Sequence, residues 1–136
     1  MTAVLMITMI FCHIVDDFYL QGILAKLKQR SWWEQNYPDE KYEGDYVVAL
    51  IEHSFSWAFM VMLPILGHML LVGNVNGNFY FFAVMVNMII HSLVDNLKAN
   101  ELKIGLTVDQ ICHVVQIVVT LFFYIVFCSA GWEVIH

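Results

Sequence analysis

Three pairs of histidine and aspartate lie in apolar stretches of this chain, and in each pair the two residues are four positions apart. The pairs are His13 with Asp17, His91 with Asp95, and Asp109 with His113. Because a helix repeats about every 3.6 residues, this spacing places both side chains of a pair on one face, one turn apart. His53, in a further apolar stretch, adds a fourth imidazole. The sequence therefore contains several candidate ligands that helices can present together.

Imidazole and carboxylate groups are ligands for zinc, iron and manganese, and helical bundles build metal sites from such groups on facing helices. We therefore predict a divalent metal ion (zinc, iron or manganese) as the cofactor. The predicted ligands are His13, Asp17, His53, His91, Asp95, Asp109 and His113. A bound ion of this kind lowers the pKa of a coordinated water to about 7 and so creates a nucleophile. Three of these residues are also the candidate catalytic groups, as ligands or as a general base: Asp17, Asp95 and Asp109.

Two polar residues continue these helical faces and are candidates for substrate binding. Gln21 lies one turn beyond the first pair, and Lys98 lies one turn beyond the second. The Lys98 ammonium can hold an anionic headgroup or a phosphate, or it can simply extend to the membrane surface. Asn87 and Gln116 lengthen the polar faces of the third and fourth apolar stretches.

The composition indicates which class of protein positions these groups. Hydrophobic residues make up 60% of the 136 residues, charged residues make up 13%, and the mean hydropathy is +0.70. A soluble domain of this size needs roughly a quarter of its residues charged. We therefore predict an integral membrane protein. The net charge of −6 and the pI of about 5.3 argue against nucleic acid as a partner, because nucleic acid selects basic surfaces.

Four apolar segments are each near the roughly 20 residues that an α-helix needs to cross a bilayer. They cover approximately residues 3–24, 46–72, 79–97 and 106–128. We expect residues 1–136 to form one domain, an all-α bundle of four transmembrane helices. The first segment has no basic region before its apolar run and contains ionisable residues. We therefore expect it to be a retained helix and not a cleaved signal peptide.

The basic residues predict the orientation of the helices. All six lysines and arginines fall in two connections, residues 25–45 and 98–105, and the 73–78 turn has none. By the positive-inside rule, both basic connections are cytoplasmic and both termini face outward. Tryptophans and tyrosines cluster in the 25–45 segment, so we expect this segment to lie along the membrane surface.

The depth of the polar residues predicts a single site. An ionisable group near the centre of a membrane helix costs about 2.5–3.5 kcal/mol, so such groups face protein or water and not lipid. Measured from the cytoplasmic ends, the histidines and aspartates of all four helices lie about two turns deep. Two other roles fit the same residues. They could form a proton or ion pathway, which would need a homo-oligomer, or hydrogen bonds that only hold the helices together.

Several segments also match the motifs of a known family. His13–Gln21 resembles an H-x-x-x-D-F-x-x-Q motif, and His53 stands where the family has a histidine. His91–Lys98 and Asp109–His113 are similar to H-x-x-x-D-x-x-K and D-Q-x-x-H elements. In this order the motifs resemble an uncharacterised family of bacterial and phage membrane proteins, domain of unknown function 3307. The resemblance implies a bacterial inner membrane and adds Gln110 to the candidate substrate-binding residues.

The sequence thus predicts a membrane-embedded metal-dependent hydrolase whose substrate reaches the cytoplasmic leaflet. One alternative is an ion or proton transporter built as a homo-oligomer. Another is a non-catalytic phage or host-defence membrane factor whose polar residues only specify helix packing. The lipid bilayer is the expected partner in each case.

Overall fold

The structure is a computed structural model that describes residues 1–132, with side chains described for residues 1–127. It is entirely helical, and its described part contains no β-strand. Among the shorter elements, η1 is a π-helix and η2 a 3-10 helix. The elements in chain order are α1 (Thr2–Val15), η1 (Asp16–Leu20), α2 (Leu24–Leu27), α3 (Arg30–Asn36), η2 (Glu40–Tyr42), α4 (Asp45–Leu71), α5 (Gly77–Ala99) and α6 (Leu106–Trp132).

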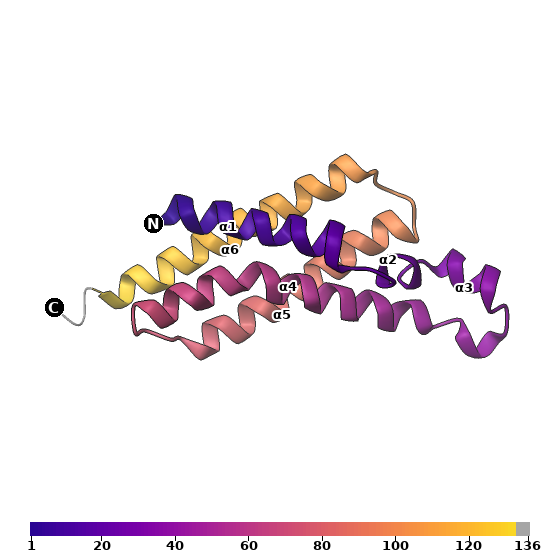
Figure 1. The fold of residues 1–136 in the computed structure, drawn as a ribbon, viewed down its shortest axis with the longest axis horizontal. Coiled ribbons are helices and arrows are strands. Elements are labelled where there is room, and N and C mark those ends of the chain that lie inside the picture. Colours follow the sequence, from indigo (N-terminus) through magenta and orange to yellow (C-terminus); the bar gives the residue numbers. More distant parts are fainter. Residues whose placement is uncertain (133–136) are drawn as a thin grey trace.

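Four helical segments are long and apolar enough to cross a membrane, which confirms the predicted all-helical fold with four candidate membrane spans. They are Thr2–Leu20, Glu40–Leu71, Gly77–Ala99 and Leu106–Phe127. Figure 1 shows them running along the long axis of the molecule. The start of α1, the end of α6 and the α4–α5 turn lie at one end, and α3 lies at the other (Figure 1). By length and composition, all four segments could cross a membrane.

The first predicted segment, residues 3–24, is shorter and less regular than expected. After α1 the chain widens into the π-helix η1 and then turns at Gly22, whose φ is +49°. The Gln21 side chain donates to the main-chain carbonyl of Asp17. The wide turn allows two adjacent residues to face inward, so both Asp16 and Asp17 are buried. π-Helical turns of this kind are frequent at functional sites.

The predicted 25–45 surface segment is folded and docks onto the end of the bundle. The Trp33 indole N–H donates to the main-chain carbonyl of Leu27 at 2.7 Å. Asn100, at the end of α5, accepts from the Arg30 main-chain N–H at 2.7 Å and donates to the Lys28 carbonyl at 3.1 Å. These bonds fix the short helices α2 and α3 relative to α5.

The interior is divided into two zones along the bundle axis. The half nearer the start of α1 is apolar, with Met9, Met62, Ile65 and Leu121 almost fully buried. The half nearer α2 and α3 holds the buried histidines and aspartates. The apolar zone supplies the packing that stabilises the bundle, and it holds the four helices at the separation that brings the polar side chains together.

Candidate metal centre

All the predicted ligands are buried in the polar zone. Helix α1 and η1 contribute the first pair, α4 contributes one histidine, and α5 and α6 contribute a pair each. Their exposed fractions are 2% for His13, 3% for Asp17, and 0% for His53, His91, Asp95, Asp109 and His113. The i, i+4 spacing turned each pair inward, as expected from the sequence.

One ligand group lies between η1, α4 and α5. It comprises Asp17, His53 and His91, each of which offers an atom within 4.8 Å of the others. His53 Nε2 is 3.4 Å from Asp17 Oδ1 and 3.2 Å from His91 Nε2. Asp95 Oδ2 lies 3.3 Å from the same His53 nitrogen. Three atoms from η1 and α5 therefore lie within 3.4 Å of His53 Nε2.

Two further groups share members with the first and centre on His113. One combines His113 with His91 and Asp95, and the other combines it with Asp17 and Asp109. His113 Nε2 is 3.4 Å from Asp109 Oδ1 and 3.6 Å from Asp95 Oδ1. The three groups form one continuous cluster.

Several atoms at the middle of this cluster have no hydrogen-bond partner within the described side chains. They are Asp17 Oδ1, Asp95 Oδ1, Asp109 Oδ1 and His113 Nε2. A buried polar atom without a partner costs about 1–3 kcal/mol, and more when the group is charged. Each of the three carboxylate oxygens lies 3.4–3.6 Å from an imidazole nitrogen, so either a protonated imidazole or a bound metal ion would supply the positive partner.

His13 differs from the prediction that it is a metal ligand. The Trp57 indole donates to His13 Nδ1 at 2.7 Å, and the other ring nitrogen, Nε2, lies 3.0 Å from Gln110 Oε1. Because an indole can only donate, Nδ1 must accept, so the neutral ring carries its proton on Nε2 and donates to Gln110. Both ring nitrogens thus have protein partners, and His13 lies outside the three ligand groups.

The two glutamines predicted to bind substrate also have protein partners. The Gln110 amide donates to Asp17 Oδ2 at 2.9 Å and to Asp109 Oδ2 at 3.0 Å. His13 fixes the orientation of this amide, so Gln110 orients two carboxylates of the cluster. Gln21 donates to the main chain of η1, which stabilises the wide turn.

Lys98 lies at the rim of the cluster. Its ammonium is 2.5 Å from Asp109 Oδ2 and 3.9 Å from Asp95 Oδ1, and its side chain is 26% exposed. The ammonium thus pairs with carboxylates of the cluster, and the role of Lys98 in holding an anionic group stays a prediction.

Lys28 is a member of the cluster that sequence reasoning missed. The sequence places Lys28 only among the basic residues of the 25–45 segment. In the structure its side chain is 6% exposed and its ammonium lies 2.5 Å from Asp95 Oδ2. The chain reaches this position because η1 and the turn at Gly22 direct α2 back onto the bundle. Because this turn follows no periodic sequence pattern, the position of Lys28 could not be predicted from the sequence.

Trp57 and Asp16 were also missed. Trp57 stacks on His91, with ring centroids 4.2 Å apart and an interplanar angle of 17°. It lies one turn after His53 on the same face of α4, a spacing that could have identified it. Asp16 Oδ1 accepts from the Ser56 hydroxyl at 2.7 Å, and its burial follows from the π-helical turn.

The predicted continuation of the polar faces forms a separate network between α5 and α6. Gln116 donates to Asn87 Oδ1 at 2.9 Å, and the Asn87 amide donates to Thr120 Oγ1 at 2.9 Å. These bonds lie one turn from the cluster and hold the two helices that supply its second and third pairs.

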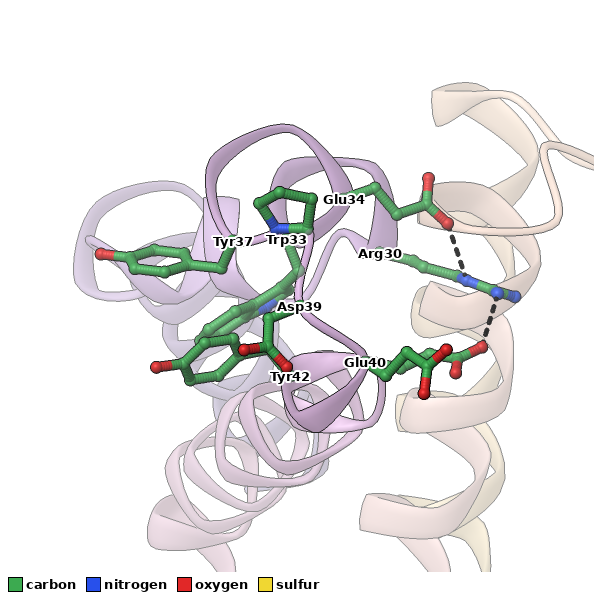
Figure 2. Close-up of a pocket in the computed structure, with 9 residues that line it drawn as sticks. Arg30, Trp33, Glu34, Tyr37, Asp39, Glu40 and Tyr42 are labelled. Carbon is green, nitrogen blue, oxygen red and sulfur yellow. Dashed lines mark hydrogen bonds and ion pairs between the residues drawn. The ribbon is translucent and has the colours of Figure 1, made fainter.

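A hollow of about 230 Å³ lies outside the cluster, in the segment between α2 and α4. Figure 2 shows Arg30 directed at Glu34 and away from the aromatic rings on the other side. Arg30 Nε is 3.0 Å from Glu34, and Nη2 is 3.2 Å from Glu43. The Trp33 and Tyr42 rings stack with centroids 6.2 Å apart. No predicted site residue lies in this exposed hollow.

The charges of the cluster leave room for a cation. Three carboxylates face two ammonium groups, so with neutral imidazoles at least one negative charge is uncompensated. A buried charge without a partner is strongly unfavourable. The charge balance and the unpartnered oxygens therefore point the same way.

No family model, curated protein or solved structure matches this chain. The resemblance of its motifs to domain of unknown function 3307 stays a prediction. The function is therefore inferred from the chemistry of the centre.

Proposed function

We propose that this chain is a membrane-embedded metalloprotein, a hydrolase whose divalent ion is held by Asp17, His53, His91 and Asp95. The observation that carries the proposal is the position of His53 Nε2, which has three candidate ligand atoms at 3.2–3.4 Å: Asp17 Oδ1, Asp95 Oδ2 and His91 Nε2. Ligands about 2.0–2.2 Å from a tetrahedral zinc ion lie about 3.3–3.6 Å from one another. The three distances from His53 Nε2 fit this range, whereas His91 Nε2 and Asp95 Oδ2 are 3.8 Å apart. Binding of an ion would therefore require Asp95 Oδ2, which now pairs with Lys28, to move slightly.

The remaining residues have roles that follow from their contacts. A bound ion supplies Lewis-acid activation of water or of a substrate oxygen. Asp109 Oδ1 has no hydrogen bond among the described side chains and lies 3.4 Å from His113 Nε2. This pair can accept and hold a proton beside the ion, the role of a general base. Lys28 and Gln110 are positioning residues, because each acts on a carboxylate of the cluster.

The proposal includes a location. The bundle end that carries α2, α3 and the basic connections is the cytoplasmic end, because all six lysines and arginines belong to it. The centre then lies just inside the cytoplasmic leaflet of a bacterial inner membrane, where a lipid-borne substrate can reach it. Membership of domain of unknown function 3307 belongs to the same proposal.

A proton pathway is the second candidate, since His53, His91 and His113 have ring nitrogens only 3.2 Å apart in succession. A relay needs each N–H to lie in the plane of the ring and point at the next nitrogen. The His91 and His113 rings stack, with centroids 4.1 Å apart and planes 30° apart, and their Nδ1 atoms also lie at hydrogen-bonding distance. The geometry is therefore compatible with both candidates, and metal analysis together with flux measurements decides between them.

Metal analysis of the protein purified without chelator tests the proposal. We expect about one zinc, iron or manganese ion per chain, lost in His91→Ala and in the isosteric Asp17→Asn. His68→Ala is the matched control, because His68 pairs with Tyr124 in the apolar zone and should leave the metal in place. Less than about 0.2 ions per chain in the unaltered protein would remove the metal proposal.

The hydrolytic step needs its own assay. Product release from phospholipid vesicles should stop on chelation and return when the metal is restored. Metal retention with ion flux into liposomes, abolished by His91→Ala, would instead support the transporter.

A further inference from the structure

A large groove runs along the outside of the bundle between α5 and α6. Its volume is about 910 Å³, and phenylalanine, isoleucine and valine make up most of its lining. It extends from Asn76, at the start of α5, to Val94 and Ile111. Since both helices are membrane-span candidates, the groove follows the depth of the bilayer.

The inner end of the groove adjoins the metal centre. Val94 immediately precedes Asp95, and Cys112, which also lines the groove, immediately precedes His113. Asn87 and Gln116 form part of the floor. The inner end of the groove therefore lies at the same level of the bundle as the buried carboxylates, which themselves do not line it.

The lining indicates a flexible apolar occupant. Helices that pack closely in membranes use small residues at the contact, whereas most residues here are bulky, such as Phe82, Ile90 and Phe123. A flexible hydrocarbon chain can follow an irregular surface of this kind, and a second helix would be held away from it.

The polar end of the groove indicates an anionic headgroup. Lys98 lies one turn beyond Val94 on the same face of α5. Its ammonium pairs with Asp109 Oδ2 at 2.5 Å, and its side chain is 26% exposed, so a remaining N–H can donate to a headgroup oxygen. A lysine near an anionic lipid surface contributes about 1 kcal/mol of attraction. Along α5 the apolar groove comes before Lys98, which matches an anionic lipid whose acyl chain lies in the groove and whose headgroup lies at the lysine.

We propose that the α5–α6 groove binds one acyl chain of an anionic phospholipid and presents its headgroup to the centre. Binding depends only on the groove and Lys98. The further statement that such a lipid is the substrate rests on the proposed hydrolase function.

A matched pair of variants tests the binding. Val119 lines the groove and Val118 does not, yet their exposed fractions are 46% and 45%. The protein is incorporated into vesicles of equal phosphatidylglycerol and phosphatidylcholine and extracted into detergent, and the retained lipid is measured by native mass spectrometry. We expect about a fivefold preference for phosphatidylglycerol. Val119→Trp should lower its retention about tenfold and Val118→Trp should not. Equal losses, or no retained lipid in the unaltered protein, would overturn the proposal.

Two cysteines supply a second readout. Cys112 lines the groove, Cys12 lies outside it, and both are half-buried. In a Cys128→Ser background, phosphatidylglycerol should slow modification of Cys112 by a lipid-soluble maleimide relative to Cys12. Equal protection of the two thiols would contradict the proposal. A cross-linked dimer that forms in the unaltered protein and is lost in Val119→Trp would also contradict it, because it would show that a second copy of the chain occupies the groove.

The two proposals fail separately. Lipid retention in protein that holds no metal when purified without chelator would leave the groove proposal standing and remove the hydrolase. Metal bound at the centre with no retained lipid would do the reverse.

Discussion

Ion pairs of similar length occur in two regions that differ almost completely in burial. In the surface segment, Arg30 lies 3.0 Å from Glu34, and these side chains are 50% and 61% exposed. In the centre, Lys28 lies 2.5 Å from Asp95, and the exposed fractions are 6% and 0%. Exposed pairs contribute about 0.2–1 kcal/mol each, whereas breaking a buried pair costs about 3–5 kcal/mol. Burial, more than distance, decides what these contacts do.

The comparison also separates two uses of polar residues. The hollow in Figure 2 keeps its charges in solvent, where water satisfies whatever the protein does not. The centre lacks that option, so each of its polar atoms needs a protein partner or a ligand. The unpartnered oxygens at Asp95 and Asp109 are therefore informative, while exposed carboxylates such as Glu43 are not.

The largest expected effect comes from removing the buried cation alone. Lys28→Met leaves Asp95 buried without its closest partner, so we expect a loss of about 3–5 kcal/mol in the free energy of unfolding. Denaturant unfolding in detergent micelles measures it. Arg30→Met removes the exposed counterpart, and an equal loss of unfolding free energy in that variant would contradict the importance of burial.

A smaller effect is expected at Trp57. Trp57→Phe keeps a ring beside His91 but removes the indole N–H that His13 Nδ1 accepts. Leaving that nitrogen unpaired should cost about 1–3 kcal/mol, again measured by unfolding. Trp32→Phe, in the surface segment, is the control, and a similar loss there would contradict the assignment.

The third prediction separates positioning from ligation among the histidines. His13→Gln should weaken metal affinity by about 10–100-fold and still allow the site to fill at excess metal, because His13 is outside the ligand groups and acts through Gln110. His53→Gln should abolish binding, since His53 Nε2 lies at the middle of the first group. Metal analysis of both variants at excess metal decides the matter, and loss of metal in His13→Gln would return that residue to the ligand set.

The smallest effect is expected in the surface segment. Glu43→Gln removes one exposed partner of Arg30 and should cost about 0.2–1 kcal/mol. Because 1 M salt screens charges beyond about 3 Å, the difference from the unaltered protein should nearly vanish at that concentration. A loss of stability that does not depend on salt would contradict this, because it would mean that the Arg30–Glu43 pair is buried and not exposed to solvent.

Much of the fold could be predicted because two periodic signals control it. Apolar length predicted four membrane-span candidates, and the i, i+4 spacing predicted that His91 with Asp95, and Asp109 with His113, share a face. Both signals are local properties of a helix, so a single sequence is sufficient to recognise them.

The rest depended on contacts between distant segments. Lys28 enters the centre only because the π-helix and Gly22 turn the chain back. His13 was assigned as a ligand because its spacing matched, but its partners, Trp57 and Gln110, come from other helices. Periodicity predicts which way a residue faces, and it carries no information on what it meets there.

The central claim is that the buried cluster, and not the exposed acidic surface, holds a divalent ion. An anomalous-scattering map of crystals grown with the metal tests this directly. The account predicts a peak about 2.0–2.2 Å from His53 Nε2 and His91 Nε2. A peak only at exposed carboxylates such as Glu34 and Glu43, or no peak between the two imidazoles at full metal occupancy, would contradict it.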